Sequence, residues 1–311
     1  MKITISNESL KMTLHVPDGA KGYYRGTRFD WAGVFESIEY RGCNYAEPWF
    51  ESYSPTMHDA VCGPAEEFGP IGFDEAAPGG RFLKIGVGML ERMDDGPYDR
   101  FRLHPIAEAG ERTVSQSEDS VIFTHRLESP SGYGYEYSKE IHITGKDSFR
   151  ISHSLKNIGT IGLRTEVYNH NFFTLGLLET GPGRTLDFPF SPDGDWRAEY
   201  SEVGFSDKGI RFTRTLREGE SVFTGNLHQA APAPSGCIPA ILEPVCSPNA
   251  FELCESATGR GVVASCSEPM TRAVFWANHR IACIEPYIDV SLELGHEFRF
   301  HIDYKLLSLQ D

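Results

Sequence analysis

One stretch just past the middle of the chain carries an unusual set of chemical groups, running from Glu166 to Phe173 (EVYNHNFF). Side chains of a β-strand alternate between its two faces. As a strand, this stretch therefore places on one face Arg164, Glu166, Tyr168, His170 and Phe172. Such a face suits a ligand-binding cleft, and His170 titrates close enough to neutral pH to act as an acid or a base. The alternative is an exposed strand on which the histidine is incidental.

A second polar cluster lies near the C-terminus. The apolar run 281–284 is followed directly by Glu285, and Trp276 begins the segment. A carboxylate at the end of a buried strand is costly unless it is paired or used, so Glu285 is a candidate base, with a rim position as the alternative. Trp276 is a candidate ring for stacking on a sugar, although most tryptophans are structural.

Further candidates lie in the N-terminal third. Glu66 and Glu67 stand beside glycines and an aromatic residue, as groups that hold adjacent hydroxyls of a sugar would. Lys84 interrupts an apolar run, and Arg28 lies in a segment rich in aromatic residues. Each has a plain alternative: a solvated acidic loop for the glutamates, a side chain that reaches solvent for Lys84, and a packed surface for Arg28.

Composition narrows the function classes. The 311 residues carry a net charge of −15, which disfavours a nucleic-acid partner and is compatible with a neutral small-molecule carbohydrate. The seven cysteines are odd in number and scattered, which indicates reduced thiols. We find no H-E-x-x-H, G-x-S-x-G or C-x-x-C pattern, so no metal site is expected from these motifs. A histidine–carboxylate acid–base pair is the chemistry that remains.

The elements that must position these groups are β-strands. Period-two alternation is frequent and helical periodicity is scarce. Expected strands lie at 10–16, 121–127, 135–143, 149–155, 162–175, 209–215, 221–227, 250–256, 261–267, 272–277, 281–287 and 297–307. We expect a tight hairpin connection at 145–147. Residues 42–80 resemble a loop. Residues 228–236 resemble a linker, but the strand pattern resumes directly after them, so we expect no domain boundary there.

These observations predict an all-β protein with one domain over residues 1–311, built from large antiparallel sheets, two of them packed together. The N-terminus lacks the pattern of a signal peptide, and no apolar stretch has the length of a membrane span. We therefore expect a cytoplasmic protein with no membrane partner. The oligomeric state is not determined by these patterns.

Tyr168 to Phe173 (YNHNFF) resembles the asparagine–histidine–x–(Tyr/Phe)–Phe motif of the aldose 1-epimerase (galactose mutarotase) family, and 281–287 (IACIEPY) resembles that family's C-terminal strand with its catalytic glutamate. The resemblance implies a galactose mutarotase-like β-supersandwich. It also implies that His170 donates a proton to the sugar ring oxygen while Glu285 takes the proton of the anomeric hydroxyl. The ring then opens, rotates and closes on the other face, without a cofactor.

The N-terminal third departs from that family. Typical members carry an Asn-Arg pair and then a His-Gly segment, whereas this chain has 63–68 (GPAEEF) and 83–86 (LKIG). Arg28, Glu67 and Lys84 are the expected substitutes, and an unusual or modified sugar is the expected substrate. Three alternatives stay open: a non-catalytic carbohydrate-binding protein, a sugar-phosphate epimerase, and a glycoside-active enzyme that uses Glu66 or Glu67 with Glu285.

Overall fold

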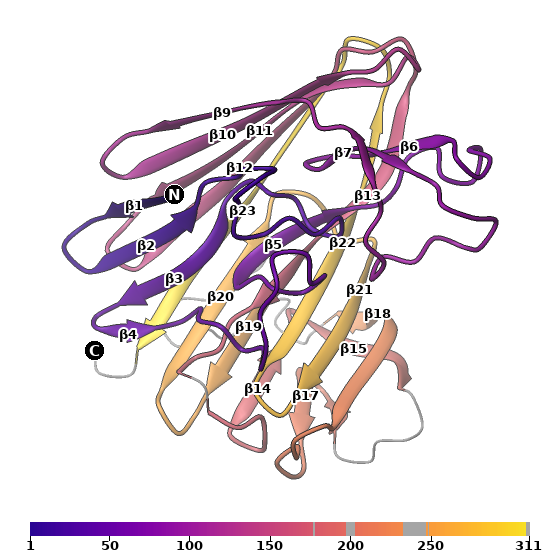
Figure 1. The fold of residues 1–311 in the computed structure, drawn as a ribbon. Helices are drawn as coiled ribbons and strands as arrows, with labels where there is room; N and C mark the ends of the chain where they lie inside the picture. Colours follow the sequence, from indigo (N-terminus) through magenta and orange to yellow (C-terminus); the bar gives the residue numbers. More distant parts are fainter. Residues whose placement is uncertain (177, 197–202, 233–246, 248, 309–311) are drawn as a thin grey trace.

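The structure is a computed structural model that describes residues 1–176, 178–196, 203–232, 247 and 249–308. Over these residues the regular elements are twenty-three β-strands in four antiparallel sheets (Figure 1). Nothing in the described part of the chain forms a helix long and apolar enough to span a membrane. The expectation of an all-β fold is confirmed.

The largest sheet has ten strands in the order β16-β17-β14-β19-β20-β23-β12-β11-β10-β9. Their bounds are Val203–Ser206 (β16), Gly209–Phe212 (β17), Arg184–Asp187 (β14), Ala250–Glu255 (β19), Arg260–Cys266 (β20), Glu297–Ser308 (β23), Ser148–Asn157 (β12), Gly134–Ile143 (β11), Ser120–Glu128 (β10) and Glu111–Gln116 (β9). The C-terminal strand β23 lies in the interior of this sheet, between β20 and β12.

The second sheet has six strands in the order β15-β18-β21-β22-β13-β5. Their bounds are Phe190–Trp196 (β15), Ser221–Pro232 (β18), Arg272–Asn278 (β21), Ala282–Leu292 (β22), Leu163–Phe172 (β13) and Gly63–Phe68 (β5). Both polar clusters recognised in the sequence lie in this sheet, on β13 and on β21–β22.

Two smaller sheets complete the described fold. One has the order β1-β2-β3-β4, and the other has the order β6-β7-β8. Their bounds are Lys2–Ser6 (β1), Leu10–His15 (β2), Val34–Tyr40 (β3), Cys43–Asn44 (β4), Arg81–Lys84 (β6), Gly88–Glu91 (β7) and Ile106–Glu108 (β8).

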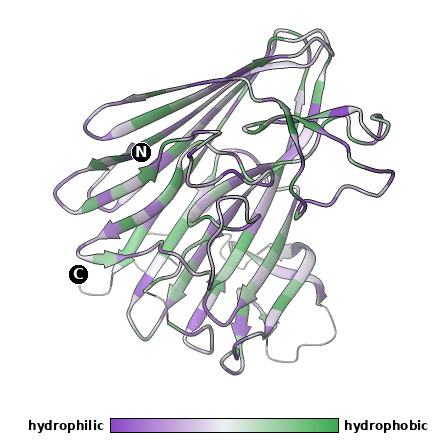
Figure 2. Ribbon diagram, in the orientation of Figure 1, coloured by the Kyte–Doolittle hydropathy of each residue, from purple (hydrophilic) through white to green (hydrophobic). Residues whose placement is uncertain are grey.

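The two larger sheets share one apolar core. Val167 of β13 and Ile284 of β22 belong to the same buried cluster as Tyr137 of β11 and Phe300 of β23. Alternation explains why, since most of the inward-facing residues of these strands are apolar. Figure 2 shows this change of hydropathy from residue to residue along many strands.

The opposite face of the six-stranded sheet is covered by the N-terminal third of the chain. Phe172 of β13 and Cys283 of β22 share a second buried cluster with Phe29 and Trp49, which lie in loops. Figure 1 shows these purple loops in front of the sheet. Because loops cover this face incompletely, it is where a cavity forms.

Most of the expected strands are present, and a connection at 144–147 joins β11 to β12 as expected. The assignment of 42–80 as a loop was wrong, because it contains β4 and β5. Strand β5 has no β-branched residue and carries two adjacent carboxylates, so it lacks strand propensity; its burial depends on distant cations. Strand β18 continues to Pro232, and 233–236 lie outside the described residues.

Candidate functional site

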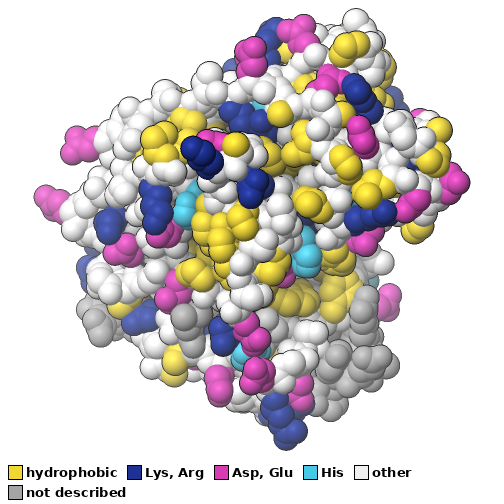
Figure 3. Space-filling view, viewed as in Figure 1, with side chains coloured by type: hydrophobic (Ala, Val, Ile, Leu, Met, Phe, Trp, Pro, Cys, Tyr) yellow, Lys and Arg dark blue, Asp and Glu magenta, His cyan; other side chains and the backbone are white. Residues whose placement is uncertain are grey.

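A cavity of about 760 Å³ lies between the six-stranded sheet and the loops that cover it. Its floor comes from β13, β18, β21 and β22, and its walls come from Arg28, Trp49 and the segments 58–59 and 98–101. Figure 3 shows hydrophobic side chains gathered near the middle of this side of the molecule, with charged side chains and histidine around them. The volume lies within the range of small-molecule sites.

The pairing of the strands arranges the floor in rows. Tyr168 of β13 lies between Glu67 of β5 and Tyr287 of β22, and Tyr287 lies beside Arg272 of β21. The registered pairing of β13 with β22 ends at Tyr168 and Tyr287, and two residues beyond it on each strand the side chains of His170 and Glu285 meet. Within that row the neighbours Ala65 and Val274 are small. Space therefore remains above His170 and Glu285.

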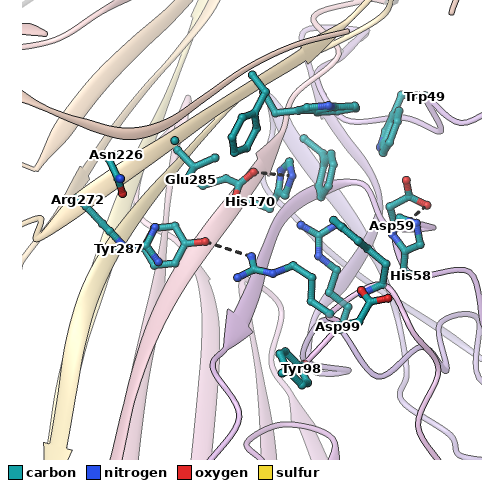
Figure 4. Close-up of a pocket in the computed structure, with 18 residues that line it drawn as sticks. Trp49, His58, Asp59, Tyr98, Asp99, His170, Asn226, Arg272, Glu285 and Tyr287 are labelled. Carbon is teal, nitrogen blue, oxygen red and sulfur yellow. Dashed lines mark hydrogen bonds and ion pairs between the residues drawn. The ribbon is translucent and has the colours of Figure 1, made fainter. Parts of the chain in front are cut away.

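His170 and Glu285 are in direct contact, with 3.0 Å between His170 Nε2 and Glu285 Oε1 (Figure 4). Both side chains are about 95% buried, and the imidazole is stacked on Phe172 at 3.7 Å between ring centres. A carboxylate only accepts hydrogen bonds, so Nε2 carries the proton. Burial lowers the pKa of His170 below its ordinary value, and the Glu285 carboxylate opposes that shift.

Glu67 anchors a buried ionic cluster behind the cavity wall. It accepts hydrogen bonds from Arg28 Nε at 2.9 Å, from Lys84 Nζ at 3.1 Å and from the Tyr168 hydroxyl. Burial by itself raises the pKa of Glu67, but Lys84, Arg28 and Arg100 outweigh it and hold the pKa at about 2. Glu67 is therefore ionised and fixes the guanidinium of Arg28 at the cavity.

Arg100 and Arg272 complete one side of the cavity. Arg100 Nη1 donates to the hydroxyls of Tyr168, at 3.0 Å, and of Tyr287, at 3.2 Å. The Arg272 guanidinium lies 3.5 Å from the centre of the Tyr287 ring and donates to Glu166. These contacts orient the phenol of Tyr287 at the cavity (Figure 4).

Glu66 lies on the other face of β5 and does not line the cavity. Adjacent strand residues point in opposite directions, so Glu66 faces the core between the sheets. There it accepts hydrogen bonds from Lys139 and from Asn169 Nδ2, and lies 3.4 Å from His153. Burial raises its pKa, but Lys139 and His153 lower it to about 2. Glu66 is therefore fully engaged in the core.

An aromatic wall closes another side of the cavity. Trp49 is stacked on Phe172 with 5.2 Å between ring centres and 10° between ring planes, and its Nε1 donates to Val61 O at 3.0 Å. Trp276 meets Trp49 edge to face at 5.4 Å and lies 6.1 Å from His170. Each ring of the wall thus contacts another ring, and Trp49 is also bonded to the backbone.

Of the eight residues expected from the sequence, His170, Glu285, Arg28 and Trp276 line the cavity. Glu67, Lys84 and Tyr168 form the layer that holds Arg28. Sequence reasoning assigned no role to five further lining residues: His58, Asp59, Arg100, Asn226 and Arg272. His58 and Asp59 are adjacent in the sequence, and their side chains approach to 3.8 Å.

Asn226 reaches the cavity because β18 is irregular. The register with β21 shifts between Thr224 and Leu227, and Asn226 has a φ of 57°. Such a bulge redirects side chains, and asparagine tolerates this conformation better than most residues. Among the described residues, no three His, Cys, Asp or Glu side chains converge as a metal ligand set.

Comparison with solved structures identifies the fold. A galactose mutarotase-like protein from Clostridium acetobutylicum has a TM-score of 0.61 and 11% identity over 99% of this chain and 95% of its own. One from Lactobacillus casei has a TM-score of 0.57 and 14% identity, over 98% and 100% of the two chains.

An aldose epimerase homologue from C. elegans has a TM-score of 0.56 and 13% identity, over 99% of each chain. The chain thus has the galactose mutarotase-like fold. No protein-family model matches the sequence, and comparison with curated proteins yields no significant match.

Proposed function

We propose that this protein is an aldose 1-epimerase-like enzyme that interconverts the α and β anomers of a sugar. The observation that carries the proposal is the contact of His170 with Glu285 on the floor of a cavity in this fold. An acid and a base side by side on paired strands are what the ring opening of a hemiacetal requires. The aromatic wall and the oriented Arg28 and Tyr287 supply the apolar and polar surfaces that a sugar ring needs.

The mechanism moves one proton at each end of the breaking bond. Glu285, as the carboxylate, takes the proton of the anomeric hydroxyl. Protonated His170 gives its Nε2 proton to the ring oxygen as the bond from that oxygen to the anomeric carbon breaks. The open-chain aldehyde rotates about its C1–C2 bond and closes with its other face exposed. The reverse transfers then restore both groups, and the sequence of steps consumes no co-reactant.

Arg28 supports these roles without transferring a proton itself. Its positive charge is held near Glu285 by Glu67, and both charges affect the pKa of His170. Because the cluster is buried, these charges are weakly screened. The charge of Arg28 therefore acts at close range on the site where the two proton transfers take place.

A second candidate is carbohydrate binding without catalysis. It is favoured by the 3.0 Å contact itself, since a sugar must separate His170 from Glu285 before each can reach its own oxygen. If that contact persists with sugar bound, the protein binds and does not turn over.

Mutarotation of freshly dissolved α-aldoses, followed by polarimetry or NMR, tests the proposal. We expect acceleration by the wild type and a loss of about 10²- to 10⁴-fold in Glu285→Gln and His170→Asn. Saturable binding without acceleration of any aldose would support the second candidate instead. An unchanged rate in both variants would refute the assigned roles.

A further inference from the structure

A second groove adjoins the cavity on the far side of the aromatic wall. It has a volume of about 350 Å³ and shares Trp49, Asp59 and Trp276 with the cavity. The remainder of its lining comes from 50–52, from Met57, from the turn that leads into β18 at 219–221, and from the end of β21 with the residue after it, 278–279. The mechanism proposed above uses none of these residues.

The cavity alone is larger than one sugar ring needs. Its volume of about 760 Å³ is toward the upper end of the roughly 300–1,000 Å³ that accommodates drug-sized ligands, and a single hexose is smaller than those ligands. The Trp276 ring meets the His170 ring edge to face, with 6.1 Å between ring centres. A sugar held at His170 therefore reaches the wall that the two spaces share.

The polar groups of the groove are held in fixed orientations. Asn278 Oδ1 accepts the backbone N–H groups of Arg280, at 2.8 Å, and Ile281, at 3.1 Å. Its NH₂ group has no hydrogen-bond partner within the described part of the chain. His279 Nε2 accepts from Arg280 Nε at 3.1 Å, which leaves Nδ1 as the protonated nitrogen. Two preoriented donors beside indole rings suit the hydroxyls and C–H faces of a saccharide.

The charge of the groove indicates whether the saccharide it binds is neutral or anionic. Among the described residues that line it, the ionisable ones are Glu51, Asp59, Glu220 and His279, and none is a lysine or an arginine. Glu220 is paired with Arg214 at 2.6 Å, which fixes the position of its carboxylate. Three carboxylates repel a phosphate, sulfate or carboxylate substituent, whereas the hydroxyls of a neutral sugar donate hydrogen bonds to them.

We propose that this groove is a second saccharide subsite, and that the substrate is a neutral reducing disaccharide or longer oligosaccharide. The reducing-end ring occupies the cavity with its anomeric centre at His170 and Glu285, and the next ring lies against Trp276 in the groove. This inference rests on the proposed function and adds its substrate class.

Calorimetric titration of the wild type with sugars at anomeric equilibrium tests the inference. At equilibrium the reaction produces no net heat, so binding is measured whether or not the protein catalyses. Matched pairs share the reducing-end sugar: glucose with cellobiose, maltose, laminaribiose and gentiobiose; galactose with β1,4-galactobiose; xylose with xylobiose; mannose with β1,4-mannobiose. We expect at least one disaccharide to bind tenfold or more tightly than its monosaccharide.

Two variants test whether the tighter binding of the disaccharide arises in the groove. Ser221→Trp and Ser52→Trp each place an indole in the groove from a different side, and each is expected to reduce the ratio of the two dissociation constants to about one. Ser131→Trp adds the same group on the exposed turn between β10 and β11 and is expected to preserve the ratio. The monosaccharide constant in each variant reports whether the cavity is folded.

The outcomes separate the two proposals. Monosaccharide binding and mutarotation without any gain for a disaccharide would overturn the subsite and leave the proposed function standing. A gain that survives both groove variants would also overturn the subsite. A disaccharide gain without mutarotation would support the subsite and refute catalysis. No binding of any sugar would overturn both.

Discussion

Replacing Glu67 by glutamine removes the charge on which the buried cation cluster depends. Glu67 is 1% exposed and Lys84 is fully buried. The carboxylate contacts both Lys84 and Arg28 within 3.1 Å. Glutamine preserves the shape of the side chain but leaves two buried cations facing a neutral amide. A lone buried charge is much less favourable than a buried pair.

Two estimates of the cost agree. Removing one partner of a buried ion pair costs about 3–5 kcal/mol. The pKa of Glu67 is lowered from 4.5 to about 2, which corresponds to about 3 kcal/mol of stability at neutral pH. Because the folded-state pKa is the lower one, this stability is complete above pH 4.5 and is lost as the pH falls through 2. We expect a contribution of about 1 kcal/mol to remain at pH 3.

Urea unfolding of wild type and Glu67→Gln at pH 7 and pH 3 measures both effects. The double variant Glu67→Gln/Lys84→Met removes a cation together with the anion, and we expect it to regain at least about 1 kcal/mol. Glu136→Gln breaks an exposed pair with Arg126 and should cost less than about 1 kcal/mol. A cost below 1 kcal/mol at pH 7, or an equal cost at both pH values, would refute the reasoning.

Four further outcomes are expected. The alkaline limb of kcat/KM should have its midpoint below pH 6.5, because burial lowers the pKa of His170 and the acid form is lost earlier; a midpoint above 7 contradicts this. Tyr287→Phe should raise KM about tenfold and change kcat little in mutarotation assays, since the phenol only orients the sugar; an equal loss in kcat would assign it to the chemistry. Glu66→Gln should lower the urea midpoint with an unchanged KM, because Glu66 faces the core; a KM shift above about tenfold would place it in the site. Phosphate at 10 mM should not compete with neutral sugars in the groove, which calorimetry with a bound disaccharide measures.

The strands of the sheets follow from local sequence. Alternation over 135–143 and 149–155 predicted β11 and β12 with their connection, and the polar face of 163–172 predicted the side chains of β13 that meet the site. This signal can be recognised because a strand with one solvent-exposed face and one buried face alternates polar and apolar residues along its whole length. The His170 and Glu285 motifs were also readable, since their residue types are unusual in strands.

Strand β5 shows where this reasoning fails. Its two carboxylates and lack of branched residues made 63–68 resemble a loop, yet all six residues are buried. The reason is tertiary: Glu66 meets Lys139, seventy-three positions away, and Glu67 meets Lys84 and Arg28. Local sequence patterns do not show that a cation from another sheet will lie next to these carboxylates.

The sequence by itself thus determined an all-β chain and singled out His170 and Glu285, which lie in contact in the structure, because alternation and residue chemistry are local properties. Tertiary structure alone decided that Glu66 and Glu67 serve opposite faces, that Arg100, Arg272 and the bulged Asn226 enter the cavity, and that a groove continues beyond Trp276. These depend on strand register and on loops packed from distant parts of the chain. These positions are stabilised by burial and ion pairing between residues far apart in the sequence, and such contacts produce no periodic pattern along the chain.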